Sequence, residues 1–111
     1  MDIDIIIGDK SLNVSLENAF RFDAEKLMQK VNDFSRSLGT DISGLRIEKL
    51  IPRMIKGVAG CENGCPSDAK SFVREGFGNF SLSYVEGGIL KAEQQLDNGK
   101  NLEIKIFPEF D

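Results

Sequence analysis

The chain opens with two short runs in which apolar and polar residues alternate. Asp2 to Ile7 and Ser11 to Leu16 each follow a period of two, and Gly8, Asp9 and Lys10 separate them. Successive side chains of a β-strand point to opposite faces, so this period predicts two strands that each have one apolar face. A short connection that contains glycine is typical of a β-hairpin. The pattern therefore predicts an N-terminal hairpin.

A helical period replaces this alternation after residue 22. Asp23 is a residue type that caps the free N–H groups of a first turn, and Gly39 suits the left-handed backbone that ends a helix. Between them, apolar residues recur every three or four positions and would share one helical face. That face comprises Ala24, Leu27, Met28, Val31, Phe34 and Leu38. The pattern predicts an amphipathic helix between Asp23 and Gly39.

Residues 45 to 56 are compatible with two structures. Apolar residues follow helical spacing from Ile47 to Val58. Pro52 lies in the middle of this pattern, where proline removes a backbone hydrogen bond and clashes with the preceding turn at a cost of ~3 kcal/mol. A strand from Leu45 to Ile51, followed by a short helix that starts at Pro52, avoids this cost because proline is tolerated in a first turn. We favour the strand and short helix, with one continuous helix as the alternative.

The remaining residues predict one more helix and three strands. Pro66 to Glu75 has the pattern of a short helix that ends at Gly76, with Phe72 facing inward. Three alternating runs follow, joined by turn sequences at 87–88 and 97–100. Their apolar residues share one face, and serine, lysine, glutamate and glutamine occupy the other. This alternation is typical of an antiparallel sheet that helices cover on one side.

These elements together predict an α+β fold. The antiparallel sheet would consist of the N-terminal hairpin plus a C-terminal three-stranded meander, packed on one side by two or three helices. The chain has 111 residues, which is a common size for one hydrophobic core. We therefore expect a single domain that spans residues 1–111.

Composition and charge narrow the possible functions. The longest uninterrupted apolar run is Ile5–Ile7, which excludes a membrane-spanning segment. Acidic residues stand where a signal peptide would be positively charged, so a cytoplasmic protein is expected. The net charge of −4 argues against a nucleic-acid partner. Because the chain has no histidine, a Ser-His-Asp or Cys-His relay within it is excluded.

The candidate chemistry lies in a glycine-rich loop that holds the two cysteines of the chain, Cys61 and Cys65. Pro66 would open the next helix, and the N-terminal end of a helix favours a thiolate and so would lower the pKa of the Cys65 thiol. Cys61, between Gly60 and Gly64, could reach Cys65 and form a reducible disulfide. Both cysteines are therefore candidate catalytic residues of a thiol redox site.

Cys61 and Cys65 are also candidate metal ligands. The run from Cys61 to Pro66 resembles the end of the bacterial ferredoxin motif C-x2-C-x2-C-x3-C-P. The two upstream ligand positions of that motif fall on Ile55 and Val58. Two thiolates cannot complete a four-coordinate site alone, although a symmetric dimer could bring four together. The sequence names no cofactor and assigns no class of enzyme.

Basic residues recur at helical spacing in the middle of the chain, with Glu48 as the one acidic residue among them. On a continuous helix these residues would form a stripe opposite the apolar face, able to bind an anion or an acidic partner. If Pro52 breaks the helix, the stripe does not form. The stripe comprises Arg46, Lys49, Arg53 and Lys56.

Two interpretations of function remain. The first, which the cysteine pattern favours, is a thiol-based redox or metal-linked site at Cys61 and Cys65. The second is a non-catalytic interaction module in which the cysteines are structural or incidental. Such a module would bind a protein partner, or a second copy as a homodimer, through a sheet edge, through Phe107 and Phe110, or through the basic stripe.

Overall fold

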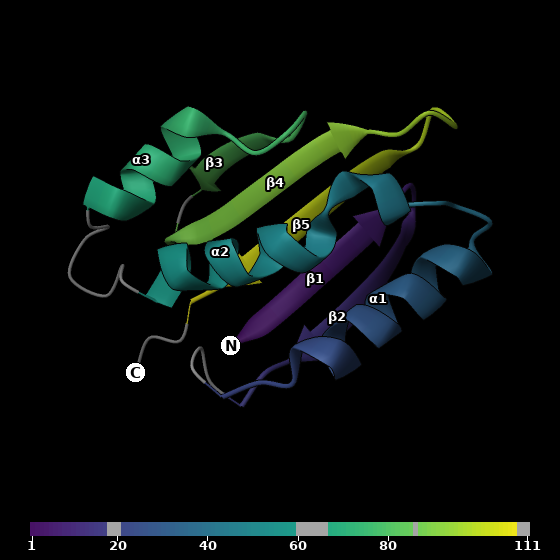
Figure 1. The fold of residues 1–111 in the computed structure, drawn as a ribbon, viewed down its shortest axis with the longest axis horizontal. Coiled ribbons are helices and arrows are strands. Elements are labelled where there is room, and N and C mark those ends of the chain that lie inside the picture. The colour runs from purple at the N-terminus through teal and green to yellow at the C-terminus, as the bar shows by residue number, and fades with distance from the viewer. Residues whose placement is uncertain (18–20, 60–66, 86, 109–111) are drawn as a thin grey trace.

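In the computed structural model, which describes residues 1–17, 21–59, 67–85 and 87–108, the described residues form a five-stranded antiparallel sheet in the order β2-β1-β5-β4-β3 (Figure 1). The strands are β1 Asp2–Ile7, β2 Lys10–Ser15, β3 Ser81–Val85, β4 Ile89–Gln95 and β5 Asn101–Phe107. The helices are α1 Ala24–Ser37, α2 Ile47–Ala59 and α3 Ser67–Glu75, with a short 3-10 helix at Ser43–Leu45. Figure 1 shows α1, α2 and α3 on the same face of the sheet. The predicted α+β fold is confirmed.

The pairing of β1 with β5 joins the N-terminal hairpin to the C-terminal meander. Its register places Ile3 opposite Ile106 and Ile5 opposite Ile104. Facing residues of antiparallel strands point to the same side, so the two strands build one apolar surface under the helices. The first hairpin turns at Gly8, whose φ of +63° is a left-handed conformation that glycine adopts without strain.

Helix α1 has the caps that the sequence predicts. The Asp23 carboxylate accepts a hydrogen bond of 3.1 Å from the backbone N–H of Lys26, and Gly39 follows the helix with a φ of +65°. Leu27 and Val31 are buried on the inward side. Ala24, which the pattern also placed on that side, is exposed because it lies in the first turn at the edge of the layer.

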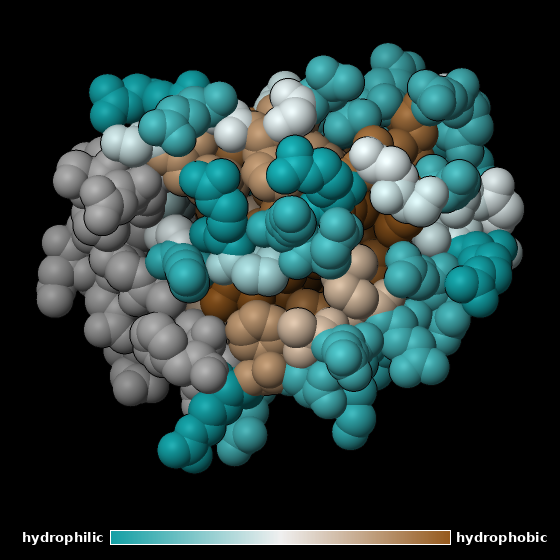
Figure 2. Space-filling view, viewed as in Figure 1, coloured by the Kyte–Doolittle hydropathy of each residue, from teal (hydrophilic) through white to brown (hydrophobic). Residues whose placement is uncertain are grey.

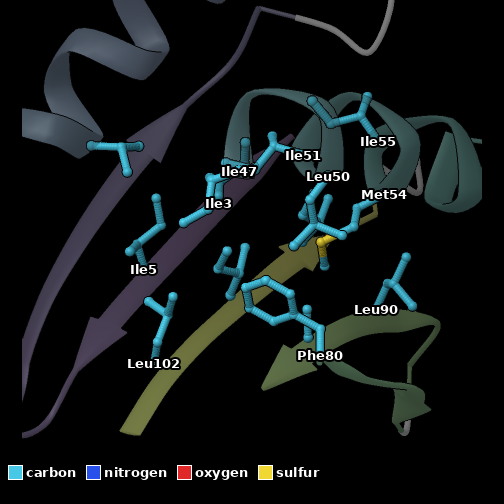
Figure 3. Close-up of a cluster of buried hydrophobic side chains, with 14 of the residues drawn as sticks. Ile3, Ile5, Ile47, Leu50, Ile51, Met54, Ile55, Phe80, Leu90 and Leu102 are labelled. Atoms are coloured by element: carbon cyan, nitrogen blue, oxygen red, sulfur yellow. The ribbon is translucent and has the colours of Figure 1, made fainter. Parts of the chain in front are cut away.

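Helix α2 runs without interruption through Pro52, so the strand predicted from Leu45 to Ile51 and the helix start at Pro52 are wrong. Burial explains why the helix continues. Burying one large apolar side chain stabilises a fold by roughly 1.5–3 kcal/mol, so six of them outweigh the ~3 kcal/mol cost of proline. Figure 3 shows α2 side chains pointing toward the sheet, where Ile3, Leu90 and Leu102 lie. The buried α2 residues, each at most 1% exposed, are Ile47, Leu50, Ile51, Met54, Ile55 and Val58.

Helix α3 packs against both α2 and β3. The predicted stop is confirmed, because Gly76 donates its backbone N–H to the carbonyl of Phe72 at 3.0 Å and has a φ of +77°. A second connection crosses from the sheet to α2, where the Tyr84 hydroxyl donates a hydrogen bond of 3.1 Å to the carbonyl of Gly57. The C-terminal end of α2 is therefore anchored by both α3 and β3.

The face of the sheet away from the helices carries charged side chains on β4 and β5, as the alternation predicts. Lys91 lies 3.5 Å from Glu93 and 3.8 Å from Glu103, and Lys105 lies 3.8 Å from Glu103. Only the pair of Lys91 with Glu103 crosses from β4 to β5, and the other two pairs lie within one strand, so charges of both signs alternate on this face. Among the described helices, none is both long enough and apolar enough to cross a membrane.

Candidate functional site

The unbroken course of α2 brings three of the four basic residues together. At 100° per residue, positions 49, 53 and 56 lie within one narrow sector of the helix surface, opposite the buried row, and Arg46 lies directly before the first residue of α2. All four side chains are exposed. Figure 2 shows a band of hydrophilic side chains over α2, with hydrophobic surface beside it toward α1. We call the four residues the α2 basic face: Arg46, Lys49, Arg53 and Lys56.

Two arginines of the α2 basic face stack on aromatic rings. The guanidinium carbon Cζ of Arg53 lies 4.4 Å from the ring centroid of Phe72, and that of Arg46 lies 5.2 Å from the ring centroid of Phe77. Both rings are buried. A guanidinium that lies on a ring face keeps its N–H groups at its edge, where a planar carboxylate can accept two of them. Stacking therefore restricts the orientation of both guanidinium groups.

The two lysines of the α2 basic face form no ion pair with any residue that the structure describes. The ion pairs among the described residues lie elsewhere, between Arg36 and Asp33 at 3.8 Å and on the outer face of the sheet. Glu48, the adjacent acid on α2, is one position from Lys49 and so points in another direction. The positive charge of Lys49 and Lys56 is therefore not compensated within the described residues.

Arg46 is held in a strained backbone conformation. Its φ of +59° and ψ of +39° place it in the left-handed region, and it is the one described non-glycine residue with a positive φ. This region costs roughly 1–2 kcal/mol for a residue with a Cβ. The Arg46 carbonyl accepts hydrogen bonds from Lys49 N–H at 3.0 Å and Leu50 N–H at 3.1 Å. The strain is thus maintained at the start of α2, where the side chain stacks on Phe77.

Helical spacing in the sequence indicates all four cations but not their aromatic partners. Phe72 was expected to face inward, and nothing in its spacing indicated that Arg53 would cover it. Phe77 follows α3 and pairs with Phe80 in an isolated bridge, so its proximity to Arg46 depends on how α3 packs against α2. A linear pattern does not contain this information.

The two cysteines, Cys61 and Cys65, lie outside the described residues, so their roles as redox residues or metal ligands stay predictions. Among the residues that the structure covers, no group of three or more His, Cys, Asp or Glu side chains could hold a metal ion. Phe110 also lies outside the described residues. Phe107 is half-buried on the outer face of β5, and the edges of the sheet are β2 and β3.

A scan against family models, a search of curated proteins and a search of solved structures each find no match. Among the described residues, the α2 basic face is therefore the feature from which a function can be inferred.

Proposed function

We propose that this protein is a non-catalytic interaction module that binds an acidic segment of a partner protein on the α2 basic face. The observation that supports this proposal is the continuity of α2 through Pro52, which places Lys49, Arg53 and Lys56 on one exposed helical surface, with the exposed Arg46 directly before the helix. The proposal keeps the cytoplasmic setting that the sequence favours.

The arginines contribute geometry and the lysines contribute charge. Arg46 and Arg53 are already oriented by Phe77 and Phe72, so less side-chain entropy is lost when their N–H groups bind carboxylates. Lys49 and Lys56 are exposed, and their ammonium groups act as point charges that attract an anionic segment. The combination suits a chain of carboxylates that lies along the helix.

An acidic protein segment fits this surface better than a nucleic acid does. The whole chain has a net charge of −4, so a polyanion longer than α2 would be repelled by the rest of the molecule. The aromatic rings at the site are buried beneath the arginines and offer no open surface on which a base could stack. A short acidic segment can contact the four cations without extending over the acidic remainder of the molecule, and it needs no aromatic surface for stacking.

The proposal is tested with a fluorescently labelled oligoglutamate peptide and two matched double variants. Lys49→Gln with Lys56→Gln removes two charges from the α2 basic face. Lys26→Gln with Lys30→Gln removes the same number of charges from exposed positions of α1. We expect the first pair to weaken binding by about tenfold, or ~1.4 kcal/mol, and the second pair to leave it nearly unchanged. Binding should weaken as salt is added.

Equal losses in the two double variants would show that only overall charge matters and would overturn the proposal. Tighter binding of a single-stranded RNA oligomer than of oligoglutamate, lost in the Lys49 and Lys56 variant, would replace it with a nucleic-acid function. A circular dichroism spectrum and urea midpoint for each variant separate lost binding from lost folding.

A further inference from the structure

A cleft of about 440 Å³ lies where the end of α1 meets the loop that leads to α2. Its walls include Ser35 and Arg36 from α1 and Thr40 and Asp41 from the loop. A neighbouring hollow of about 270 Å³ shares Thr40 and Asp41, and Asn98 from the turn between β4 and β5 lines its far side. Small-molecule sites typically occupy roughly 300–1,000 Å³, so the cleft has room for a ligand.

Two residues with buried hydroxyl groups line this cleft. Ser35 and Thr40 are 4% and 6% exposed, and they are the buried polar side chains of the described residues. Ser35 continues the inward row of α1 that begins with Leu27 and Val31, where an apolar side chain would stabilise the core more. Departures from the pattern that stability favours are expected at functional sites.

Local hydrogen bonds hold both hydroxyls in place. Ser35 Oγ donates to the carbonyl of Asn32 at 3.0 Å. Thr40 Oγ1 donates to the carbonyl of Leu38 at 3.4 Å and accepts from the side-chain amide of Asn98 at 3.3 Å. A hydroxyl oxygen has two lone pairs, so Ser35 keeps its acceptor capacity while its proton is engaged. The Asn98 amide likewise has a second N–H beyond the one given to Thr40.

The rim of the cleft carries one acid and one base. The Asp41 carboxylate accepts hydrogen bonds from the backbone N–H of Ser43 at 2.9 Å and from its hydroxyl at 2.7 Å. These bonds, the backbone one above all, hold the pKa of Asp41 below its ordinary value of 3.8, so the group is an acceptor at neutral pH. Arg36 supplies donors on the same rim.

We propose that this cleft binds a small uncharged polyol, a molecule of monosaccharide size with several adjacent hydroxyl groups. A hydroxyl both donates and accepts, which matches acceptors at Ser35 and Asp41 together with donors at Arg36 in the cleft and at Asn98 in the neighbouring hollow. Arg36, which also lies 3.8 Å from Asp33, and Asp41 carry opposite charges, so charges of both signs stand at the rim. The site is separate from the α2 basic face, so the two proposals stand independently.

The test is a titration of the full ¹⁵N-labelled chain with myo-inositol, followed in proton–nitrogen correlation spectra. We expect saturable shifts at the backbone amides of residues 35–43 and at the side-chain amide of Asn98, with a dissociation constant in the millimolar range. Spermidine and inorganic phosphate serve as charged comparison probes. Saturable binding of either one at these residues, without myo-inositol binding, would overturn the assignment to an uncharged ligand.

Three variants locate the binding in the cleft. Ser35→Ala removes the buried acceptor at nearly constant volume, and Asp41→Asn alters the exposed rim without touching the core. Each should weaken myo-inositol binding by about five- to tenfold. Ser37→Ala is the matched control, because Ser37 Oγ makes the same type of bond, to the carbonyl of Phe34 at 2.7 Å, at an exposed position. Unchanged affinity in both Ser35→Ala and Asp41→Asn, or an absence of saturable shifts in the unmodified chain, would refute the proposal.

Discussion

The guanidinium of Arg53 on α2 lies over the ring of Phe72 on α3, with Cζ 4.4 Å from the ring centroid. This contact joins the two helices at the α2 basic face. It covers a buried ring and orients a cation at the same time. Arg53 therefore connects the stability of the helix pair to the proposed binding surface.

Replacing Arg53 with alanine should lower the free energy of unfolding by about 1 kcal/mol, because the stacking energy and the cover over Phe72 are lost together. Arg53→Lys keeps the charge without the planar group, so its free energy of unfolding should lie between those of the unmodified chain and Arg53→Ala. Lys49→Ala is the control on the same face and should change stability by less than ~0.5 kcal/mol. Urea denaturation measures all three. An Arg53→Ala variant as stable as Lys49→Ala would mean that the stacking contributes nothing.

Replacing Pro52 with alanine tests why α2 is continuous. Alanine restores a backbone donor within the helix and removes the clash with the preceding turn, so we expect a gain of about 1–3 kcal/mol in the free energy of unfolding. Chemical denaturation checks this gain. A loss of stability would instead show that the ring of Pro52 fixes a bend that the packing of α2 requires.

The strands and the first helix could be predicted because local signals and tertiary packing agree there. Asp23 and Gly39 delimit α1 by capping chemistry, and the alternation of β1 and β5 matches their buried positions. The prediction failed at Pro52, where the local signal opposes the packing. The burial of Leu50, Ile51 and their neighbours keeps α2 helical through Pro52. How much these side chains are buried depends on the position of the sheet, which the spacing of residues in the sequence does not reveal.

At the candidate site, too, the sequence predicted what depends on local spacing and missed what depends on tertiary packing. Helical spacing predicted that Arg46, Lys49, Arg53 and Lys56 would form a stripe if the helix continued. The contacts with Phe72 and Phe77 arise from the packing of α3 against α2, between residues 19 and 31 positions apart in the sequence. Similarly, the inward position of Ser35 is compatible with the α1 pattern, but its place in a cleft depends on the loop after Gly39.

Tyr84 should make the free energy of unfolding depend on pH in the alkaline range. Burial raises the pKa of the Tyr84 phenol above its ordinary value of 10.0, so the neutral form is favoured in the folded state. The corresponding stability is fully present below about pH 10 and is lost as the pH rises through the folded-state pKa. Ultraviolet titration of the single tyrosine measures this pKa directly.

The Tyr84→Phe variant separates the effect of Tyr84 ionisation on stability from the effect of lysines that titrate in the same pH range. It removes the hydrogen bond to the Gly57 carbonyl and should cost about 0.5–1.5 kcal/mol at neutral pH. The difference in stability between the unmodified chain and the variant should shrink above pH 10. A constant difference at all pH values would contradict the raised pKa.

The two cysteines give a prediction that depends on the sequence alone. If Cys65 lies at the start of a helix, its thiolate is favoured, and it should react with iodoacetamide faster than Cys61 near neutral pH. Mass spectrometry of partly alkylated protein measures the two rates. The double variant Cys61→Ala with Cys65→Ala should bind oligoglutamate as the unmodified chain does, because the α2 basic face is complete without the cysteines. If the folded double variant no longer bound the peptide, the cysteine loop would have to contribute to binding at the α2 basic face.

Arg46 offers the sharpest separation of stability from binding. Arg46→Gly removes both the guanidinium on Phe77 and the strain of a left-handed backbone, whereas Arg46→Ala removes the side chain and keeps the strain. The glycine variant should therefore be more stable than the alanine variant by about 1 kcal/mol. Both variants should bind oligoglutamate about threefold or more weakly than the unmodified chain, since each lacks the same cation. Thermal unfolding and fluorescence anisotropy provide the two readouts. If the more stable glycine variant also bound more tightly than the alanine variant, the contribution of Arg46 would come from the rigidity of α2 and not from its charge.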